Sequence, residues 1–104
     1  GESQLDRGLD IAMPEGTPIY AAHTGMVTTA EYSDSYGYYV VITDEDGYVT
    51  KYAHMKELLV SGGMVVEAGT QIGTVGSTGI STGNHLHLEL MHDGEYYNPI
   101  FYFN

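Results

Sequence analysis

The sequence predicts an all-β fold in a single domain, residues 1–104. Its apolar residues fall into short runs, turn signals separate most of these runs, and 14 glycines and ten tyrosines occur among the 104 residues. Aromatic and β-branched side chains favour pleated, half-buried surfaces, whereas glycine and proline favour turns. Short strands with frequent turns are typical of all-β architecture.

The first half of the chain contains the clearest strand signals. Residues 14–18 predict a turn, because proline presets φ and glycine accepts conformations closed to other residues. Asp46-Gly47 is a strong hairpin signal, so the strands on either side of it should be antiparallel neighbours. Strands are expected over residues 19–22, 25–31, 38–43 and 48–54.

The second half continues this pattern. Residues 55–59 alone have helical spacing and Ser61-Gly62-Gly63 ends them, so we expect at most a turn or two of helix. Asp93-Gly94 marks a last hairpin. Strands are expected over residues 64–66, 71–75 and 85–91.

The composition excludes several classes of function. Three Lys and Arg residues against 14 Asp and Glu give a formal net charge of -11, so the chain lacks the cations that nucleic acid requires. Cysteine is absent, so any metal must be held by histidine and carboxylate groups. There is neither an apolar run of about 18 residues nor an opening signal segment. We expect no membrane contact by this domain, with any export signal or anchor outside it.

His85-Leu86-His87 is the segment most indicative of chemistry. Side chains of a strand repeat every second residue, so an extended segment places both imidazoles on one face and Leu86 and Leu88 in the core. Two distant segments supply further ligand-type side chains, Asp6 to Asp10 and a third histidine, His54. Such groups are the usual donors of metal sites and of acid–base chemistry.

Together these motifs resemble the lysostaphin-type zinc metallopeptidases, the LytM or M23 family. The family is marked by H-x-x-x-D, a Y-A-H segment, the run G-S-T-G-x-S-T-G-x-H-L-H and a late acidic residue. The matching segments here are Asp6-x-x-x-Asp10, Ile11 to Ala22, Tyr52-Ala53-His54, and Gly76 to His87 followed by Glu89. The match spans nearly the whole chain. It implies a compact antiparallel β-sandwich with a groove across one sheet.

The resemblance also implies a site and a cofactor. Asp6, Asp10 and His87 would hold one zinc ion. His54 and His85 would lie unligated beside it, where imidazoles polarise a water molecule, shuttle its proton and stabilise the tetrahedral intermediate. Glu89 follows His87 by two residues and should share its face, where it either orders a neighbouring histidine or is solvated.

One position departs from the family pattern, because the first ligand of the family is a histidine and Asp6 stands in its place. Two carboxylates and one imidazole bring a zinc site formally to zero charge instead of +1, so the centre acidifies water and stabilises an oxyanion less. An oxygen-rich ligand set also favours harder ions or weaker zinc binding. An engineered change, a natural oxygen ligand and lost catalysis all remain open, as does a solvated loop position for Asp6.

Two functions follow from the resemblance. The first is a zinc endopeptidase that cuts stem or cross-bridge peptides of bacterial peptidoglycan, outside the cell or in its envelope, with activity impaired by Asp6. The second is a catalytically degenerate module of the same fold that binds a cell-wall or sporulation protein. His23 and His92 match no ligand position and are expected at the surface.

Overall fold

The computed structural model describes residues 8–81 and 83–97, which form nine strands and no helix. All pairings between these strands are antiparallel. The all-β prediction is therefore confirmed. The strands are β1 (Gly8–Ala12), β2 (Pro18–Tyr20), β3 (Gly25–Ser33), β4 (Gly37–Thr43), β5 (Tyr48–Leu58), β6 (Val65–Val66), β7 (Gln71–Val75), β8 (His85–His92) and β9 (Glu95–Tyr97).

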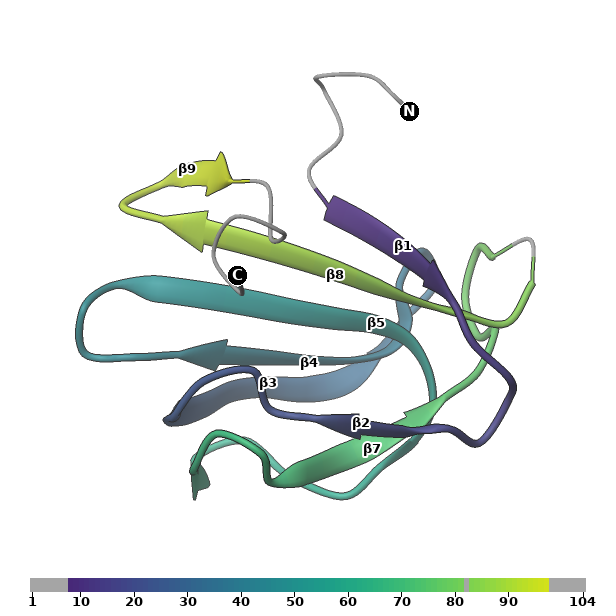
Figure 1. Cartoon of the computed structure of the whole chain (residues 1–104), viewed down its shortest axis with the longest axis horizontal. Coiled ribbons are helices and arrows are strands. Elements are labelled where there is room, and N and C mark those ends of the chain that lie inside the picture. Colours follow the sequence, from purple (N-terminus) through teal and green to yellow (C-terminus); the bar gives the residue numbers. More distant parts are fainter. Residues whose placement is uncertain (1–7, 82, 98–104) are drawn as a thin grey trace.

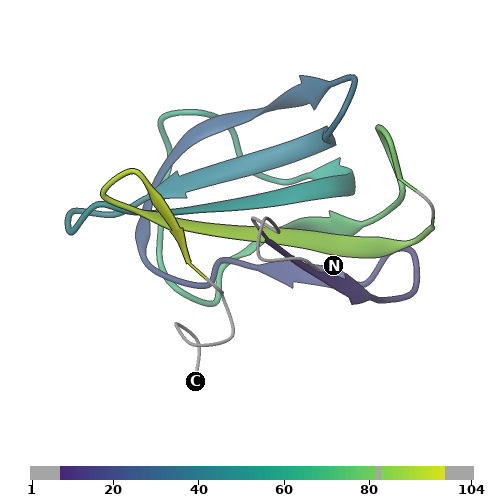
Figure 2. The same ribbon diagram turned by 90° about the horizontal axis from the view of Figure 1, so that it is seen from above.

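The main layer is a sheet in the order β1-β8-β5-β4-β3-β6, and β9 shares the outer edge of β8 with β1. β2 and β7 pair with each other and lie against this layer (Figures 1 and 2). The core lies between them, since Ile19 of β2 and Ile72 of β7 belong to the same buried cluster as Tyr52 and Leu88 of the main layer. Both predicted hairpins, at Asp46-Gly47 and at Asp93-Gly94, are confirmed.

β5 joins the two layers. Its first part, Tyr48 to Ala53, pairs with β8, and its last part, Met55 to Leu58, pairs with β7. The prediction of a helical turn over residues 55–59 is wrong, because this segment continues β5. Met55 is fully buried in the core, and pairing with β7 overrides the weak local helical preference.

The two faces of β8 have different roles. Leu86 and Leu88 are buried in the core, so His85 and His87 lie on the opposite, outer face of the main sheet. The register brings β1 and β5 beside them: Asp10 and Ala53 both pair with His87. Three strands, β1, β5 and β8, therefore meet at one place on the outer face. Among the described residues, no helix is suited to crossing a membrane.

Candidate active site

Four of the predicted site residues converge on this outer face. Asp10 Oδ1 lies 2.7 Å from His87 Nδ1 and 3.5 Å from His85 Nε2. The ring centroid of His54 lies 5.1 Å from that of His85 and 6.0 Å from that of His87. β1, β5 and β8 thus bring side chains from distant parts of the sequence into one cluster. Asp6, the remaining predicted ligand, lies outside the described residues.

His54 reaches the cluster through a kink in β5. In regular alternation it would share the core-facing side of Tyr52. Instead its φ is +61°, a left-handed conformation that is uncommon for residues other than glycine. Its backbone N–H donates to the carbonyl of Tyr36 at 2.7 Å, and its own carbonyl accepts from Gly76 N–H at 3.1 Å. These bonds lie where β5 leaves β8 for β7, and the kink places the imidazole with the other histidines.

Two of the histidines are held in the same way. Nδ1 of His54 donates to the carbonyl of Thr78 at 2.8 Å, and Nδ1 of His85 donates to the carbonyl of Gly83 at 2.9 Å. A neutral imidazole that donates through Nδ1 carries its lone pair on Nε2. Nε2 of His85 faces Asp10. In the neutral form, each ring therefore carries its lone pair on Nε2, the nitrogen that can take up a proton.

His54 is buried, and its surroundings favour the neutral form. Burial lowers the pKa of this imidazole below its ordinary value, an effect that the hydrogen bond to Thr78 opposes. The neighbouring His85 and His87 rings lower the pKa further. His54 is therefore a neutral hydrogen-bond and proton acceptor at neutral pH.

His87 lies between two carboxylates. Nδ1 faces Asp10 at 2.7 Å, and Nε2 lies 2.9 Å from Oε2 of Glu89. The hydrogen bond to Glu89, opposed by burial and reinforced by Asp10, raises the pKa of His87 above its ordinary value. Glu89 itself is buried at 5% exposure, so of its two predicted alternatives the structure favours ordering of a histidine over solvation.

Two side chains that sequence reasoning missed lie behind Glu89. Nζ of Lys51 lies 3.7 Å from Oε1 of Glu89 and 4.0 Å from the ring centroid of Tyr36. Lys51 and Glu89 are directly opposite each other in the β5–β8 register. Only the pairing of the two strands reveals this contact, because nothing near Lys51 in the sequence marks it.

A tightly packed loop supports His54. Thr78 accepts from His54 through its carbonyl, while its hydroxyl accepts from Tyr38 N–H and donates to the carbonyl of Met55. Gly79 has a φ of +76°, and a Cβ atom there would clash with the backbone of Gly37. Thr78 thus orients an imidazole through its backbone carbonyl, a role that its residue type alone does not predict.

The donor atoms partly fit a metal ion. Among the described residues, no group of three or more histidine, aspartate, glutamate or cysteine side chains is arranged to hold one. However, Asp10 Oδ1 and His87 Nδ1 face each other, and Glu89 holds the other ring nitrogen of His87. Metal-binding histidines usually have their second nitrogen held by a carboxylate or carbonyl in this way. Oxygen and imidazole nitrogen are both donors that zinc accepts.

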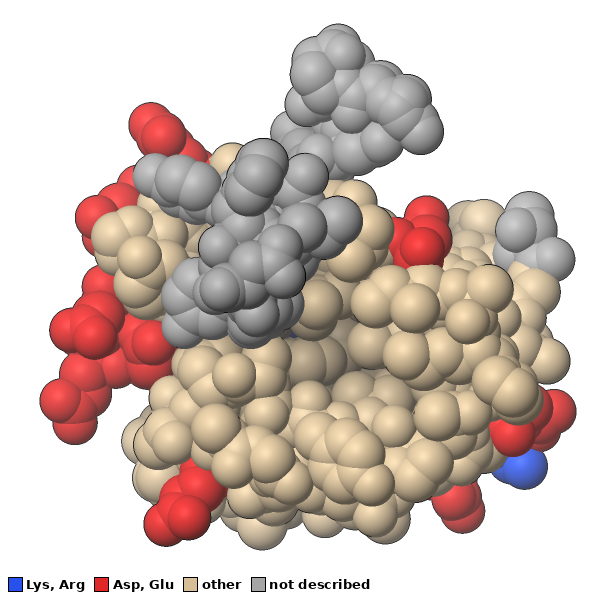
Figure 3. Space-filling view, in the orientation of Figure 1, with Lys and Arg blue, Asp and Glu red and all other residues tan. Residues whose placement is uncertain are grey.

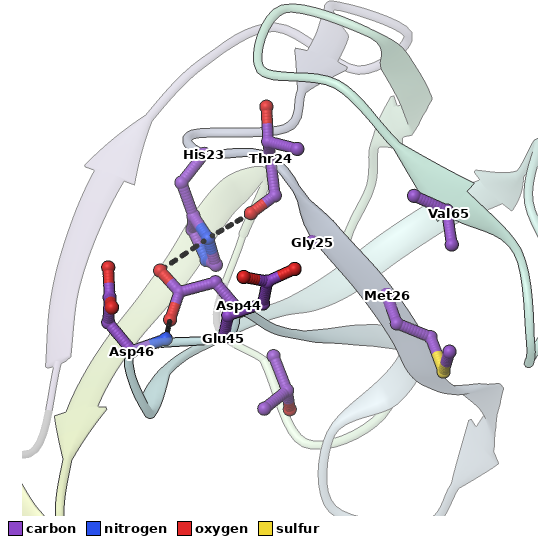
Figure 4. A pocket seen from close by; sticks show the side chains of 9 residues that line it. His23, Thr24, Gly25, Met26, Asp44, Glu45, Asp46 and Val65 are labelled. Atoms are coloured by element: carbon purple, nitrogen blue, oxygen red, sulfur yellow. Dashed lines mark hydrogen bonds and ion pairs between the residues drawn. The ribbon is translucent and has the colours of Figure 1, made fainter.

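A hollow away from the histidine cluster lies where the β4–β5 hairpin meets the start of β3 (Figure 4). It measures about 670 Å³ and is lined by His23, Thr24, Gly25, Met26, Thr43, Asp44, Glu45, Asp46 and Val65.

The expectation that His23 lies at the surface is wrong. It is 7% exposed, and its Nε2 lies 2.9 Å from Thr50 Oγ1 in the interior. His92 is half-buried, with its ring stacked on Tyr48 at 3.9 Å between centroids.

Acidic side chains line much of the edge of the face drawn in Figure 3, with little basic surface between them. This distribution accords with the net charge of -11. The resulting field repels polyanions at long range, although salt screens it beyond about 8 Å.

Several known proteins are similar to this chain in sequence or in fold. The profile of Peptidase family M23 matches residues 4–99. The peptidoglycan DD-endopeptidase ShyC of Vibrio cholerae serotype O1 is 43% identical over 99 residues, which are 95% of this chain and 23% of ShyC. The catalytic domain of lysostaphin from Staphylococcus simulans is 32% identical with a TM-score of 0.88, over 93% of this chain and 77% of that domain.

A zinc-containing peptidase from Vibrio cholerae is also similar in structure. It is 35% identical with a TM-score of 0.85, over 88% of this chain and 28% of that one. The chain spans about a quarter of the length of ShyC and of an uncharacterized metalloprotease of Buchnera aphidicola that it also matches. The profile match covers most of the sequence, and the solved relatives share the fold. This chain belongs to peptidase family M23.

Proposed function

We propose that this domain is a zinc-dependent endopeptidase that cuts peptide bonds of bacterial peptidoglycan. One observation carries the proposal: Asp10 and His87 face each other with an oxygen and a nitrogen donor, and two further imidazoles lie beside them. A metallopeptidase requires both parts, namely ligands and nearby proton acceptors. Membership of family M23 and the name of ShyC supply the substrate class.

Asp10 Oδ1 and His87 Nδ1 would hold the ion, with Asp6 as the third ligand. Zinc supplies Lewis acidity, which polarises the scissile carbonyl and acidifies a water molecule. Glu89 keeps the His87 ring in place by accepting from its Nε2–H, so that Nδ1 presents its lone pair. The described part of the protein would therefore contribute two ligands, Asp10 from β1 and His87 from β8, and the buried carboxylate of Glu89 that holds His87.

His54 and His85 would act on the reacting groups. Both donate through Nδ1 to a backbone carbonyl, and both keep Nε2 as an acceptor. One Nε2 can take the proton that the attacking water loses, and a protonated imidazole can then deliver a proton to the departing amine. The other imidazole, when it is protonated, can donate a hydrogen bond through Nε2 to the oxygen that gains negative charge. Fixed rings lose little freedom at this step.

Asp6 lowers the expected rate. Its carboxylate replaces an imidazole in the family's ligand set and makes the centre formally neutral, which weakens both zinc binding and oxyanion stabilisation. The same residue supports the second candidate function, a catalytically degenerate module that binds a cell-wall or sporulation protein. We favour the peptidase, because the described site residues His54, His85, His87, Asp10 and Glu89 all retain the chemistry that catalysis needs.

The place of action follows from the substrate. Peptidoglycan lies outside the cytoplasmic membrane, so a domain that cuts it works in the cell envelope or outside the cell. The acidic surface gives no long-range attraction to an anionic wall, so short-range contacts or other domains of a longer protein would supply the affinity.

The proposal is tested with purified protein and its Asp6→His variant. Zinc content and Kd are measured by metal analysis and chelator competition, and hydrolysis is measured as release of soluble peptides from peptidoglycan sacculi. Asp46→His is the matched control, because it makes the same chemical change at an exposed position on the far hairpin.

We expect zinc-dependent hydrolysis by the unaltered chain, faster hydrolysis and tighter zinc binding by Asp6→His, and no change for Asp46→His. Equal zinc binding and equal turnover in the first two would show that Asp6 does not impair the enzyme. If both proteins hold zinc and neither releases peptide from any wall preparation, the peptidase proposal fails and the binding module is the better account.

A further inference from the structure

Lys51 occupies an unusual position for a cation in this protein. The sequence has only three Lys and Arg residues. Lys56 pairs with Glu15 at 3.0 Å, with both side chains about half exposed. Lys51 instead points its ammonium at Glu89, whose side chain is only 7% exposed. One of the few cations of a strongly acidic domain is thus placed beside the carboxylate that contacts His87.

The contacts form a continuous series. The Tyr36 ring lies 4.0 Å from Lys51 Nζ, Lys51 Nζ lies 3.7 Å from Glu89 Oε1, and Glu89 Oε2 lies 2.9 Å from His87 Nε2. His87 Nδ1 then faces Asp10 at 2.7 Å. The two oxygens of one carboxylate are therefore shared between the lysine and the histidine.

The Lys51–Glu89 pair is largely shielded from water, with side-chain exposures of 22% and 7%. Val49, Met91 and Tyr96 line a small cavity of about 40 Å³ together with the two charged residues. Charges that are partly removed from water attract each other more strongly than charges at the surface. Strand pairing fixes the backbones, since Lys51 and Glu89 are register partners. The aromatic ring of Tyr36 adds a cation–π contact on a further side.

We propose that Lys51 is a positioning residue of the metal site, acting through Glu89. Its ammonium holds Oε1 of Glu89, which turns Oε2 towards His87 Nε2 and thereby fixes the ring with Nδ1 facing Asp10. Lys51 touches neither substrate nor metal. The inference rests on the proposed function only in that His87 and Asp10 bind the ion.

The test measures the zinc Kd of the folded, metal-free protein by competition with a chromophoric chelator. Lys51→Met removes the charge and retains much of the side chain, and Lys51→Arg keeps the charge. Lys56→Met is the matched control, because it removes the same charge from an exposed ion pair. Glu89→Gln and the double variant Lys51→Met/Glu89→Gln complete a cycle, and circular dichroism verifies folding.

Groups that orient a metal-binding histidine typically change metal affinity about 10–100-fold, so we expect that range for Glu89→Gln and about 3–10-fold weaker binding for Lys51→Met. Lys51→Arg keeps the charge and should lose less affinity than Lys51→Met, and Lys56→Met, which breaks only an exposed ion pair, should have no effect. In the Glu89→Gln background, Lys51→Met should have no further effect, because the lysine acts only through the carboxylate.

Three results would overturn the inference: unchanged affinity in Lys51→Met, equal losses in Lys51→Arg and Lys51→Met, or additive losses in the double variant. If Lys51→Met fails to fold because Glu89 is left buried without its cation, comparison of Glu89→Gln with the double variant decides the question alone. Failure of the proposed function is a separate outcome, because in that case the unaltered chain would not bind zinc at the site.

Discussion

Exchanging His54 for glycine or for alanine removes the same imidazole and separates its catalytic role from its backbone role. The φ of +61° is a left-handed conformation, which costs a residue with a Cβ atom about 1–2 kcal/mol. Glycine avoids this cost but loses about 0.5–1 kcal/mol more than alanine in conformational entropy on folding. We therefore expect His54→Gly to be more stable than His54→Ala by about 0.5–1 kcal/mol.

Thermal and urea unfolding of the metal-free variants measure this difference. For a domain of this size it corresponds to a melting temperature about 2–8 °C higher for the glycine variant. Glu31 provides the control, because it lies in β3 opposite Tyr39 and has an ordinary negative φ. There the sign reverses, and Glu31→Gly should be less stable than Glu31→Ala by about 0.5–1 kcal/mol.

Both His54 variants should lose hydrolysis about equally, by roughly 10²–10⁴-fold in kcat/KM, the usual contribution of a positioned acid or base. Their zinc affinity should remain close to that of the unaltered chain, because His54 bonds to Thr78 and to neither Asp10 nor His87. A glycine variant no more stable than the alanine variant would contradict the left-handed backbone conformation of His54. Loss of zinc binding in both variants would contradict the proposal that His54 does not bind the ion.

Three further changes test the packing and the ligands of the site. Gly8→Val places a Cβ atom 2.8 Å from His87 Cε1, so β1 or the imidazole must move. Chelator competition should then show zinc binding about 10–100-fold weaker. Unchanged affinity would show that the close approach of Gly8 to His87 has no role. Gly79→Ala adds a clash with Gly37 at a left-handed φ and should cost about 1–3 kcal/mol in urea unfolding. A smaller loss would mean that the loop relaxes freely. Asp10→Ala alters an exposed side chain, so stability should change by no more than about 0.5 kcal/mol, whereas zinc binding and hydrolysis should both be lost; retained zinc would exclude Asp10 as a ligand.

Local periodicity predicted the parts of the site that depend on neighbouring residues. His85 and His87 lie on one face because strand side chains alternate, and Leu86 and Leu88 enter the core as that rule requires. The two hairpins followed from Asp-Gly pairs, whose glycines both have a positive φ. These features need no knowledge of the rest of the chain.

Other features depend on contacts between distant segments. Alternation alone would place His54 in the core, and bonds to Tyr36 and Gly76 produce the kink that turns it outward. The contact of Lys51 with Glu89 exists only because β5 pairs with β8 in one register. Residues 55–58 form strand instead of helix for the same kind of reason, since β7 supplies their hydrogen-bond partners.

The most direct test of the metal site is a crystal structure of the zinc-loaded protein with diffraction recorded on both sides of the zinc absorption edge. An anomalous peak should lie between Asp10 Oδ1 and His87 Nδ1, within bonding distance of Asp6, with His54 and His85 beside it but not bonded to it. A peak bound by His54 or His85 in place of Asp10 and His87, or no peak on this face at saturating zinc, would contradict the account.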